Sequence, residues 1–500
     1  MFPVREPPLD ERSLEAGLDA LVRDGIYAQV TGALTSGVLL VGFALEMGAD
    51  NVHIGLLAAV PFLAQLVQIP AILLVERYRV RRAVAVIALT ASRLLLLPMA
   101  FLPLVASRDA GLGLLVALVA LNAALGAVAA CAWNSWMHDL IPEGRLGAFF
   151  GRRLSLATGF SMIAGLGGGF FVDFWNGWQP DQRSWAYSIL LLLGLAAGGA
   201  STWYLAQVPE PRMAPPERAI NLRRMVAEAF HDRNFQRLLA FLGSWNFAVN
   251  LAAPFFAVYL VDQLGFEISF VTVLMVTSQL ANTLFLRPWG RMADRFSNKA
   301  VLSVCAPLFL LCVLAWTYTA VPQRHGLTVP LLFLIHIAMG TASAGITLAS
   351  GNICLKLAPQ GRATAFLATS SMVNSLAAGI APIIGGIFAD DFVARELALV
   401  IRWASSSETG EFLTLRFRHW DFFFAFAALL GIYALHRLTL VREEGQPHEK
   451  ILLQELMMDA RRTMRNLSPV AGLRVLTTFP FGHLLLAARR KRMRDRPGQP

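Results

Sequence analysis

The sequence predicts an all-α polytopic membrane protein, with twelve membrane-spanning helices arranged as two similar six-helix bundles. Three observations predict this class. The 500 residues are 56% hydrophobic and only 15% charged, at a mean hydropathy of +0.55, whereas soluble chains carry about 25% charge. Twelve apolar runs are long enough to cross a bilayer core of about 30 Å as helices. The second half of the chain also repeats features of the first half.

The apolar runs follow one another along the whole chain. In order they lie at 25–46, 53–75, 83–104, 111–136, 154–172, 186–207, 238–261, 268–289, 300–320, 327–350, 364–388 and 421–440. Residues 1–24 carry several acidic residues and no basic stretch leading to a cleavage site. We therefore expect a cytoplasmic segment there and not a removable signal peptide. Because twelve is an even number, both termini lie on one side of the membrane.

The basic residues indicate which side that is. Most of the 43 Lys and Arg residues fall in alternate loops and in the two termini. Such a bias predicts cytoplasmic termini, here in the inner membrane of the cell. The formal charge of +10 is therefore explained by helix orientation, and no nucleic-acid partner is expected.

An internal repeat divides the spans into two sets. Leu-Ile-Pro-Glu-Gly-Arg at 140–145 recurs as Leu-Ala-Pro-Gln-Gly-Arg at 357–362. At nearly the same separation, Gln29 corresponds to Asn246 and Asp173 corresponds to Asp390. The halves are thus 25–207 and 238–440, joined by a cytoplasmic linker at 208–237. Because each half has six spans, both insert in the same orientation, as parallel repeats.

Two matched loops carry a resemblance to a known family. Gly-Arg-Met-Ala-Asp-Arg-Phe-Ser-Asn-Lys at 290–299 follows the eighth span, and Glu-Arg-Tyr-Arg-Val-Arg-Arg at 76–82 follows the second. Together with the six-plus-six topology and the repeat, these loops resemble the signature of the major facilitator superfamily of secondary transporters. The first-half copy departs from the pattern, with Ile72 and Arg79 where glycines are expected, so the subfamily stays unassigned.

The resemblance implies a gating role for these loops. In the family such contacts stabilise the outward-open state, and by position the role falls to Gly290, Asp294 and Arg295, and also to Glu76 and Arg77. A glycine lets two helices approach closely, and an acid can accept hydrogen bonds from a neighbouring helix N-terminus. The alternative is that both loops are basic anchors at the cytoplasmic surface.

The resemblance also implies that the first, fourth, seventh and tenth spans line a central cavity. Amides beside indole rings suit a polar or amphipathic solute, through hydrogen bonds and stacking. Asn246 and Asn250 are four residues apart and share a helix face. Hydrogen bonding between helices is the alternative role for each of these side chains. The candidate substrate-binding residues on those spans are Gln29, Asn134, Trp245, Asn246, Asn250, His336 and Asn352.

Two side chains within spans, one cationic and one titratable, are further candidates for a functional role, because charge within a bilayer is costly. Arg93 either recognises an anionic substrate or has a structural role, satisfied by Gln65, Asn122 or helix carbonyls. His336 either binds substrate or protons or is a neutral packing histidine. No carboxylate is expected near the middle of a span.

Two segments outside the spans show patterns of their own. Residues 396–403 and 411–418 alternate in the manner of a β-hairpin on the outer side, either as a lid or as a passive loop. Residues 441–500 form a basic cytoplasmic tail, in which 469–488 predicts a helix on the membrane surface.

The sequence therefore predicts a secondary active transporter that moves a small polar or amphipathic solute by alternating access of its two halves. Proton coupling through His336 is a hypothesis. An enzyme is disfavoured because paired carboxylates, a metal-spaced His/Cys cluster and a Gly-x-Ser-x-Gly motif are absent from the sequence. We expect no cofactor, no bound metal and a monomer in the lipid bilayer. The alternative function is a non-transporting membrane sensor or assembly factor on the same scaffold.

Overall fold

The structure is a computed structural model, and it describes residues 11–105, 107–142, 145–213, 229–319, 325–359, 363–392, 395–404, 409–418 and 420–443. Within these ranges twelve helices are long and apolar enough to cross a membrane, which confirms the predicted number. The predicted surface helix at 469–488 lies outside the described residues.

The N-terminal half contains the first six spans. The first three of these spans are interrupted, so that each of them comprises more than one helix. Span 1 breaks at Gly37, whose φ of +61° lies in the region that glycine tolerates best. In chain order the elements are α1 Glu11–Thr35, α2 Gly37–Glu46, α3 Asn51–Ala64, η1 Gln65–Val67, α4 Gln68–Tyr78, α5 Arg81–Leu94, α6 Leu96–Val105, α7 Arg108–Leu140, α8 Leu146–Trp178, η3 Pro180–Gln182 and α9 Arg183–Gln207.

The C-terminal half contains the other six spans and a pair of strands. Its interior is rich in aromatic contacts: Trp316 stacks on Phe256 with ring centroids 4.5 Å apart and also contacts Phe424. In chain order the elements are α11 Arg233–Val258, η4 Tyr259–Gln263, α12 Ile268–Arg295, α13 Asn298–Ala315, η5 Trp316–Thr319, α14 Thr328–Leu357, α15 Ala363–Phe392, β1 Glu396–Ala404, β2 Thr409–Arg418 and α16 Trp420–Thr439.

The first helix differs from the sequence-based expectation. It begins at Glu11 and not near residue 25, because Gly17 packs against Pro209 and Leu21 is fully buried. Asp24 therefore lies inside a helix, only 3% exposed, where the sequence suggested a residue at the end of a solvated segment.

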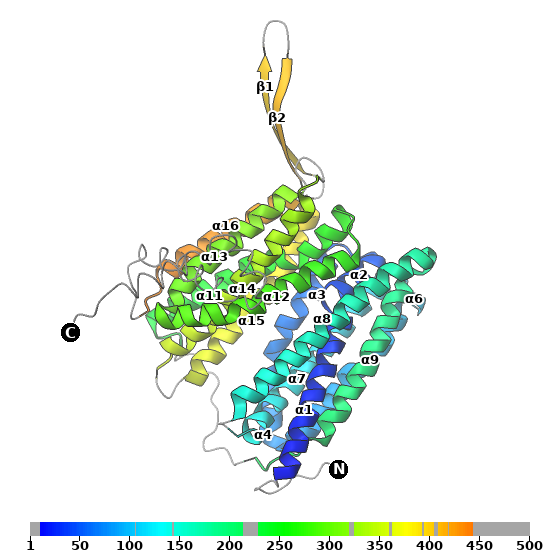
Figure 1. Cartoon of the computed structure of the whole chain (residues 1–500), viewed down its shortest axis with the longest axis vertical. Coiled ribbons are helices and arrows are strands. Elements are labelled where there is room, and N and C mark those ends of the chain that lie inside the picture. Colours follow the sequence, from blue (N-terminus) through cyan, green and yellow to red (C-terminus); the bar gives the residue numbers. More distant parts are fainter. Residues whose placement is uncertain are drawn as a thin grey trace, which may run out of the picture.

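The two strands confirm the predicted hairpin. β1 and β2 pair antiparallel, with Glu396 opposite Arg418 and Leu399 opposite Leu415, and the register shifts after Ile401. The hairpin projects away from the helices (Figure 1). We call this the hairpin side of the protein and the opposite side, where Glu11 and Glu443 lie, the terminal side.

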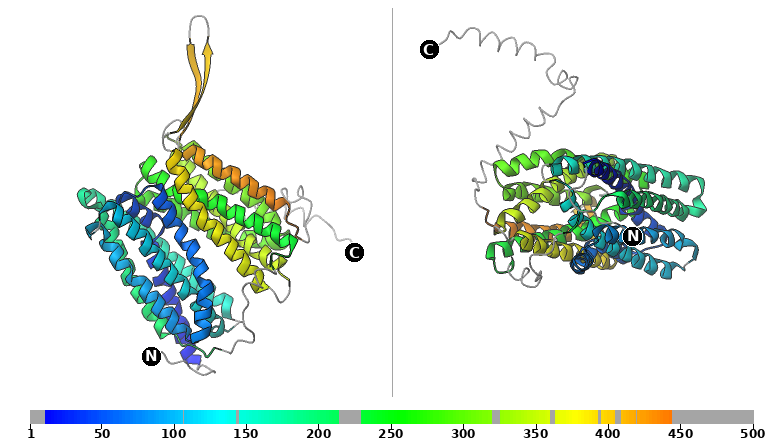
Figure 2. Two further views of the ribbon diagram at one scale, coloured as in Figure 1. Left: turned by 180° about the vertical axis from the view of Figure 1, so that it is seen from behind. Right: turned by 90° about the horizontal axis from the view of Figure 1, so that it is seen from below.

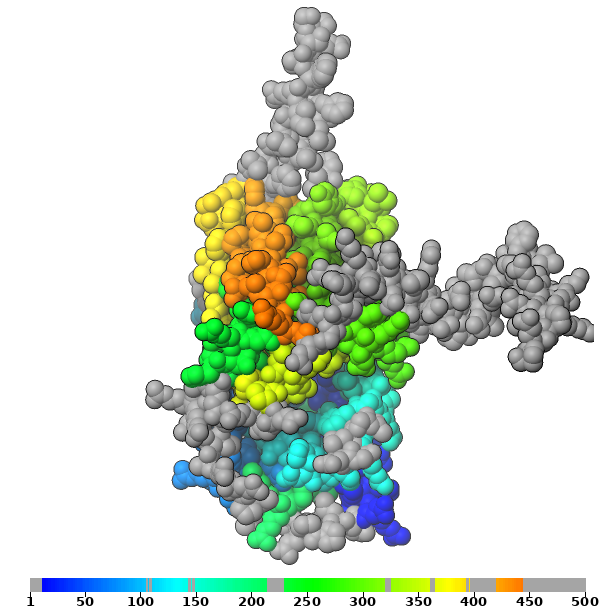
Figure 3. Space-filling model, turned by 90° about the vertical axis from the view of Figure 1, so that its left-hand side faces the viewer, coloured from blue at the N-terminus to red at the C-terminus, as the bar shows by residue number. Residues whose placement is uncertain are grey.

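The two halves form separate bundles that lie side by side. They meet near the hairpin side and diverge toward their ends on the terminal side, as two opposite views agree (Figures 1 and 2). In space-filling form the green to orange C-terminal half and the blue to cyan N-terminal half occupy distinct regions of the surface (Figure 3).

Each half is tied together on the terminal side by a buried carboxylate that follows its last span. Glu210 accepts hydrogen bonds from the backbone N–H groups of Arg81 (2.6 Å) and Arg82 (3.2 Å) at the start of α5. Glu443 accepts from those of Asn298 (3.3 Å) and Lys299 (2.7 Å) at the start of α13. Such bonds satisfy the N–H groups that a helix N-terminus leaves unpaired. The same solution in both halves is what an internal repeat predicts.

Candidate functional site

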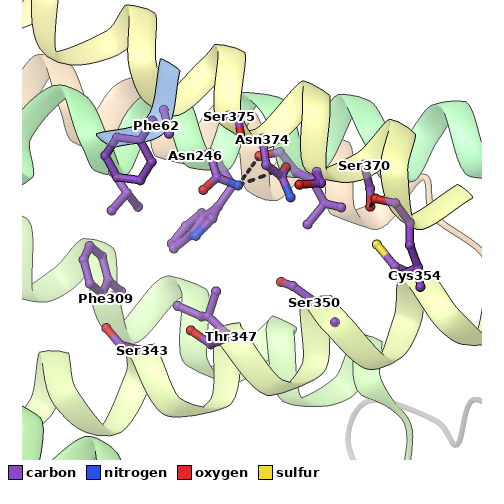
Figure 4. Close-up of a pocket in the computed structure, with 18 residues that line it drawn as sticks. Phe62, Asn246, Phe309, Ser343, Thr347, Ser350, Cys354, Ser370, Asn374 and Ser375 are labelled. Atoms are coloured by element: carbon purple, nitrogen blue, oxygen red, sulfur yellow. Dashed lines mark hydrogen bonds between the residues drawn. The ribbon is translucent and has the colours of Figure 1, made fainter. Parts of the chain in front are cut away.

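A cavity of about 630 Å³ lies against the C-terminal half and is the candidate solute site. Four of its helices, α11, α13, α14 and α15, form most of the wall, and Phe62 of α3 contributes from the other half. Aromatic side chains lie at one end and Ser350, Ser370 and Cys354 at the other (Figure 4). The wall includes Phe62, Trp245, Asn246, Phe309, Ser343, Thr347, Ser350, Cys354, Ser370, Ser371, Asn374 and Ser375.

Two amide side chains of the cavity wall are hydrogen-bonded to each other. Asn246 Nδ2 donates to Asn374 Oδ1 at 3.2 Å and to the carbonyl oxygen of Leu242 at 2.9 Å. The bond between the two amides joins α11 to α15 (Figure 4). Two of the residues proposed from sequence, Trp245 and Asn246, line this cavity.

The other predicted amides lie elsewhere. Gln29 lines a second cavity of about 400 Å³, beside Gly37 of span 1 and Thr272 of α12. Asn250 Nδ2 donates to the backbone carbonyl of Asn246 at 2.9 Å. Asn134 and Asn352 are exposed and line neither of these two cavities. The structure thus brings together only part of the predicted set.

His336 lies in the interior of the C-terminal half. It is 3% exposed, its Nδ1 is 2.8 Å from the carbonyl oxygen of Leu332, and its ring packs at 5.5 Å from the indole of Trp316. It does not line the main cavity. This placement is that of the packing histidine considered as the alternative.

Arg93 belongs to a buried cluster of charges in the N-terminal half. It interacts electrostatically with Asp24 of α1, whose carboxylate also accepts hydrogen bonds from Arg153 Nη2 (3.1 Å) and Ser201 Oγ (2.7 Å). The side chain of Arg93 passes over Gly198, where a Cβ would lie 2.6 Å from Arg93 Cδ. The carboxylate of Asp24 is thus an opposite charge close to Arg93, whereas Asn122 Nδ2 donates to the carbonyl oxygen of Ser92 at 2.7 Å. A buried charge usually has an opposite charge nearby.

The sequence did not single out Asn374 or the serines around it. They lie on the eleventh span, which is not among the four spans expected to line the cavity. A signal was nevertheless present, because Ser371, Asn374, Ser375 and Ala378 recur at helical spacing and so share one face of α15. Ser343, Thr347 and Ser350 repeat the same pattern on α14.

The halves are joined on the hairpin side by two matched carboxylates. Asp173 of α8 accepts hydrogen bonds from the N–H groups of Ile268 (3.1 Å) and Ser269 (2.7 Å) at the start of α12. Asp390 of α15 accepts from Asn51 Nδ2 (2.7 Å) at the start of α3. We call these two contacts the aspartate seal. In the sequence repeat Asp173 corresponds to Asp390, so each half contributes one carboxylate to the start of a helix in the other half.

The helices at the seal also approach closely. A Cβ on Gly386 would lie 2.4 Å from the carbonyl oxygen of Asn51, and one on Gly55 would lie 2.2 Å from that of Pro382. Only glycine permits such an approach without displacement of the backbone. Tight packing and hydrogen bonds thus join the two halves on the hairpin side.

Comparison with known proteins settles the family. The sequence profile of the Major Facilitator Superfamily matches residues 26–281 and 237–492. The chain belongs to the Major Facilitator Superfamily. A search of curated proteins by sequence finds no match to this chain.

Solved structures agree on the fold of this superfamily chain. The nucleoside transporter NupG is 14% identical at a TM-score of 0.63, covering 86% of this chain and 100% of its own. A D-xylose-proton symporter is 14% identical at 0.60, covering 88% and 98%. A bacterial homologue of the human lysosomal transporter Spinster, in an inward-facing and unoccupied conformation, is 16% identical at 0.54, covering 77% and 84%.

The superfamily loop residues lie apart from the aspartate seal, on the terminal side. Asp294 and Arg295 end α12 and are exposed, and Arg295 lies over the ring of Phe296. Glu76 is half-buried near the end of α4, and Arg77 lies over Tyr78. A Cβ on Gly290 would meet only Leu348 of its own half, at 3.6 Å. Each of these contacts is made within one half.

Proposed function

We propose that this protein is a secondary carrier that moves a small polar or amphipathic solute by alternating access of its two halves. The observation that carries the proposal is a cavity lined by aromatic, amide and hydroxyl groups. Beside it, the halves are joined by the hydrogen bonds of the aspartate seal on the hairpin side. Membership of a transporter superfamily supports it. Because one chain supplies the whole cavity wall, we propose that a monomer is sufficient.

We further propose that the terminal side is cytoplasmic, in the inner membrane of the cell. Support comes from the Lys and Arg residues concentrated in the loops of that side. The conformation would then be inward-open, with the aspartate seal holding the outer side closed. Glu76, Arg77, Gly290, Asp294 and Arg295 would contact the opposite half only in the outward-open state, as the family resemblance implies.

Proton coupling through His336 has little support from its position, because the ring lies against Trp316 away from the main cavity. We expect His336→Ala to leave any pH dependence of transport in proteoliposomes unchanged. Loss of that pH dependence, with folding intact, would restore His336 as a candidate coupling group.

A cross-link across the aspartate seal tests alternating access. The four native cysteines are replaced, Asn51 and Asp390 are changed to cysteine, and the pair is joined by a short thiol cross-linker in proteoliposomes. Counterflow of the exchanged solute should stop and return when the link is cleaved. The control pair is Ser92 and Asn122, which are hydrogen-bonded within one half and whose cross-link should leave counterflow unchanged.

Two results would count against a carrier. Counterflow that continues through the cross-linked seal would show that the halves do not alternate at this point. A failure to exchange any solute of a broad metabolite panel would favour the sensor or assembly factor that remains the alternative function.

A further inference from the structure

Most hydroxyl groups around the main cavity lack the hydrogen bond to their own helix that many hydroxyl groups within the spans make, although Ser370 Oγ donates to the carbonyl oxygen of Leu367 at 2.9 Å. Thr31, Thr277 and Thr369 each donate to a carbonyl oxygen one helical turn earlier, at 2.8–2.9 Å. Within the described chain, five cavity hydroxyls make no hydrogen bond. They belong to Ser343, Thr347, Ser350, Ser371 and Ser375.

Ser350 is the sharpest case among these hydroxyls. Its Oγ is buried and has no partner among the described residues, and its side chain is drawn at the cavity wall (Figure 4). Leaving a buried hydroxyl unpaired costs about 1–3 kcal/mol. The cavity wall therefore holds an array of groups that await hydrogen bonds from water or from a solute.

The amide pair adds donors and an acceptor in a fixed orientation. The carbonyl oxygen of Leu242 can only accept, so the amide nitrogen of Asn246 must face it. The same nitrogen uses its other hydrogen on Asn374 Oδ1. Asn246 Oδ1 and both hydrogens of Asn374 Nδ2 are then left for a ligand. A molecule with adjacent hydroxyl groups can donate to the first and accept from the second.

The wall of the main cavity contains no Asp, Glu, Lys, Arg or His among the described residues. Elsewhere the chain pairs its buried charges, as in Asp24 with Arg153 and in Arg81 with Glu210. An ion in this cavity would lose its hydration without gaining a counter-charge, which is strongly unfavourable. The cavity thus discriminates against charged solutes.

Aromatic rings cover the remaining part of the wall. Trp245 and Phe309 meet edge to face at 5.8 Å, and Phe62 lies nearby at the same end (Figure 4). Flat rings of this kind pack against the C–H face of a sugar ring or against a planar base. The cavity therefore offers hydroxyl-binding groups on one part of its wall and an apolar platform on another.

We propose that the cavity binds an uncharged polyhydroxylated solute, a sugar or a sugar-bearing molecule such as a nucleoside, and that Asn246, Asn374 and Ser350 bind its hydroxyl groups. This inference rests on the proposed carrier function and adds the chemical class of the solute. It also assigns specificity to Asn374 and Ser350.

Matched solutes test the charge rule on the full-length protein. Glucose, xylose and uridine are compared with glucuronate, with glucosamine at pH 6, where its amine is protonated, and with tetraphenylphosphonium. Binding is measured by thermal stabilisation of the purified protein, and exchange by counterflow in proteoliposomes. At least one of the three uncharged solutes should bind and exchange, with an affinity at least about tenfold higher than that of either charged sugar.

Variants test the assigned residues with that solute. Asn374→Ala and Ser350→Ala should each weaken binding about fivefold, the usual effect of one lost hydrogen bond. Ser244→Ala is the matched control, because Ser244 Oγ donates to the carbonyls of Ala240 and Phe241 on its own helix and does not line the cavity. Asn374→Asp places a carboxylate in the wall and should raise the affinity for protonated glucosamine relative to glucose.

The possible failures are distinguishable. Exchange of glucuronate or tetraphenylphosphonium without exchange of any uncharged sugar would overturn the solute class and leave the carrier function standing. Variants at Asn374 and Ser350 that bind as well as Ser244→Ala would overturn the assignment of these residues. The absence of exchange with every solute would count against both proposals.

Discussion

Single buried carboxylates fix the geometry of each half. Arg81 is completely buried and its guanidinium contacts Asp139 at 2.5 Å, Glu210 at 3.6 Å and the carbonyl oxygen of Pro211 at 2.8 Å. Arginine stays charged, so removal of one partner leaves the buried charge less well compensated. These residues act on stability before they act on transport.

Replacing Glu210 tests that conclusion. Glu210→Ala should destabilise the protein by about 3 kcal/mol, because it removes one of the two carboxylates near the buried Arg81 and leaves the N–H groups of Arg81 and Arg82 at the start of α5 without their acceptor. The measurement is the thermal unfolding midpoint in detergent. Glu11→Ala is the control, since Glu11 and Arg145 form an exposed pair at 3.6 Å and should shift the midpoint little. Equal midpoints for both variants would refute the role given to Glu210.

Glu443 gives a prediction for pH. Burial raises its pKa, but hydrogen bonds from the N–H of Lys299, the ammonium of Lys356 and the amide of Asn298 outweigh burial, so its pKa lies below the ordinary 4.5. A lowered folded-state pKa means that the stabilisation is present above the unfolded-state pKa and is lost as pH falls through the folded-state pKa. The unfolding midpoint should therefore fall in acid below about pH 4.5. Glu443→Gln should remove part of that dependence, and an unchanged acid profile would contradict the assignment.

Hydrogen bonds at helix ends help to join the two halves, beside packing along the helices. Asp173 and Asp390 each bind the start of a helix in the opposite half, and the glycines of α3 and α15 let those helices touch. Contacts at helix ends can be exchanged without unfolding either bundle. The aspartate seal is therefore suited to open and close as a unit.

Weakening the aspartate seal should change the conformational equilibrium. Asp173→Asn and Asp390→Asn should each cost about 1 kcal/mol, a shift of about fivefold toward the state that is open on the hairpin side. Spin labels at Arg152 and Arg291, which are exposed on the two halves at the terminal side, would report this as shorter distances. Asp181→Asn is the control, because Asp181 is exposed on the same side as the seal and takes no part in it. Longer or unchanged distances in the variant that carries both Asp173→Asn and Asp390→Asn would contradict the role given to the aspartate seal.

At the scale of the whole molecule, the hairpin and the basic loops lie on opposite sides. This separation gives each side a distinct chemical character. The orientation in the membrane can therefore be read with two single cysteines.

Sided labelling checks the proposed orientation. In a variant without the native cysteines, Thr409→Cys in the hairpin should react with a membrane-impermeant maleimide in intact cells. His138→Cys, at a position whose side chain is 86% exposed on the terminal side, should react only after the membrane is opened. The reverse pattern would place the terminal side outside the cell.

The sequence by itself determined the number of spans, the six-plus-six repeat, the hairpin and two cavity residues, Trp245 and Asn246. These follow from local properties: apolar length, alternation and self-similarity. Only the tertiary structure decided that Asn374 is hydrogen-bonded to Asn246, that the charge of Arg93 lies near the buried Asp24, and that the ring of His336 packs against Trp316. Such pairings depend on how each helix is rotated about its axis against its neighbours, and helix packing sets that rotation beyond what a single helix encodes.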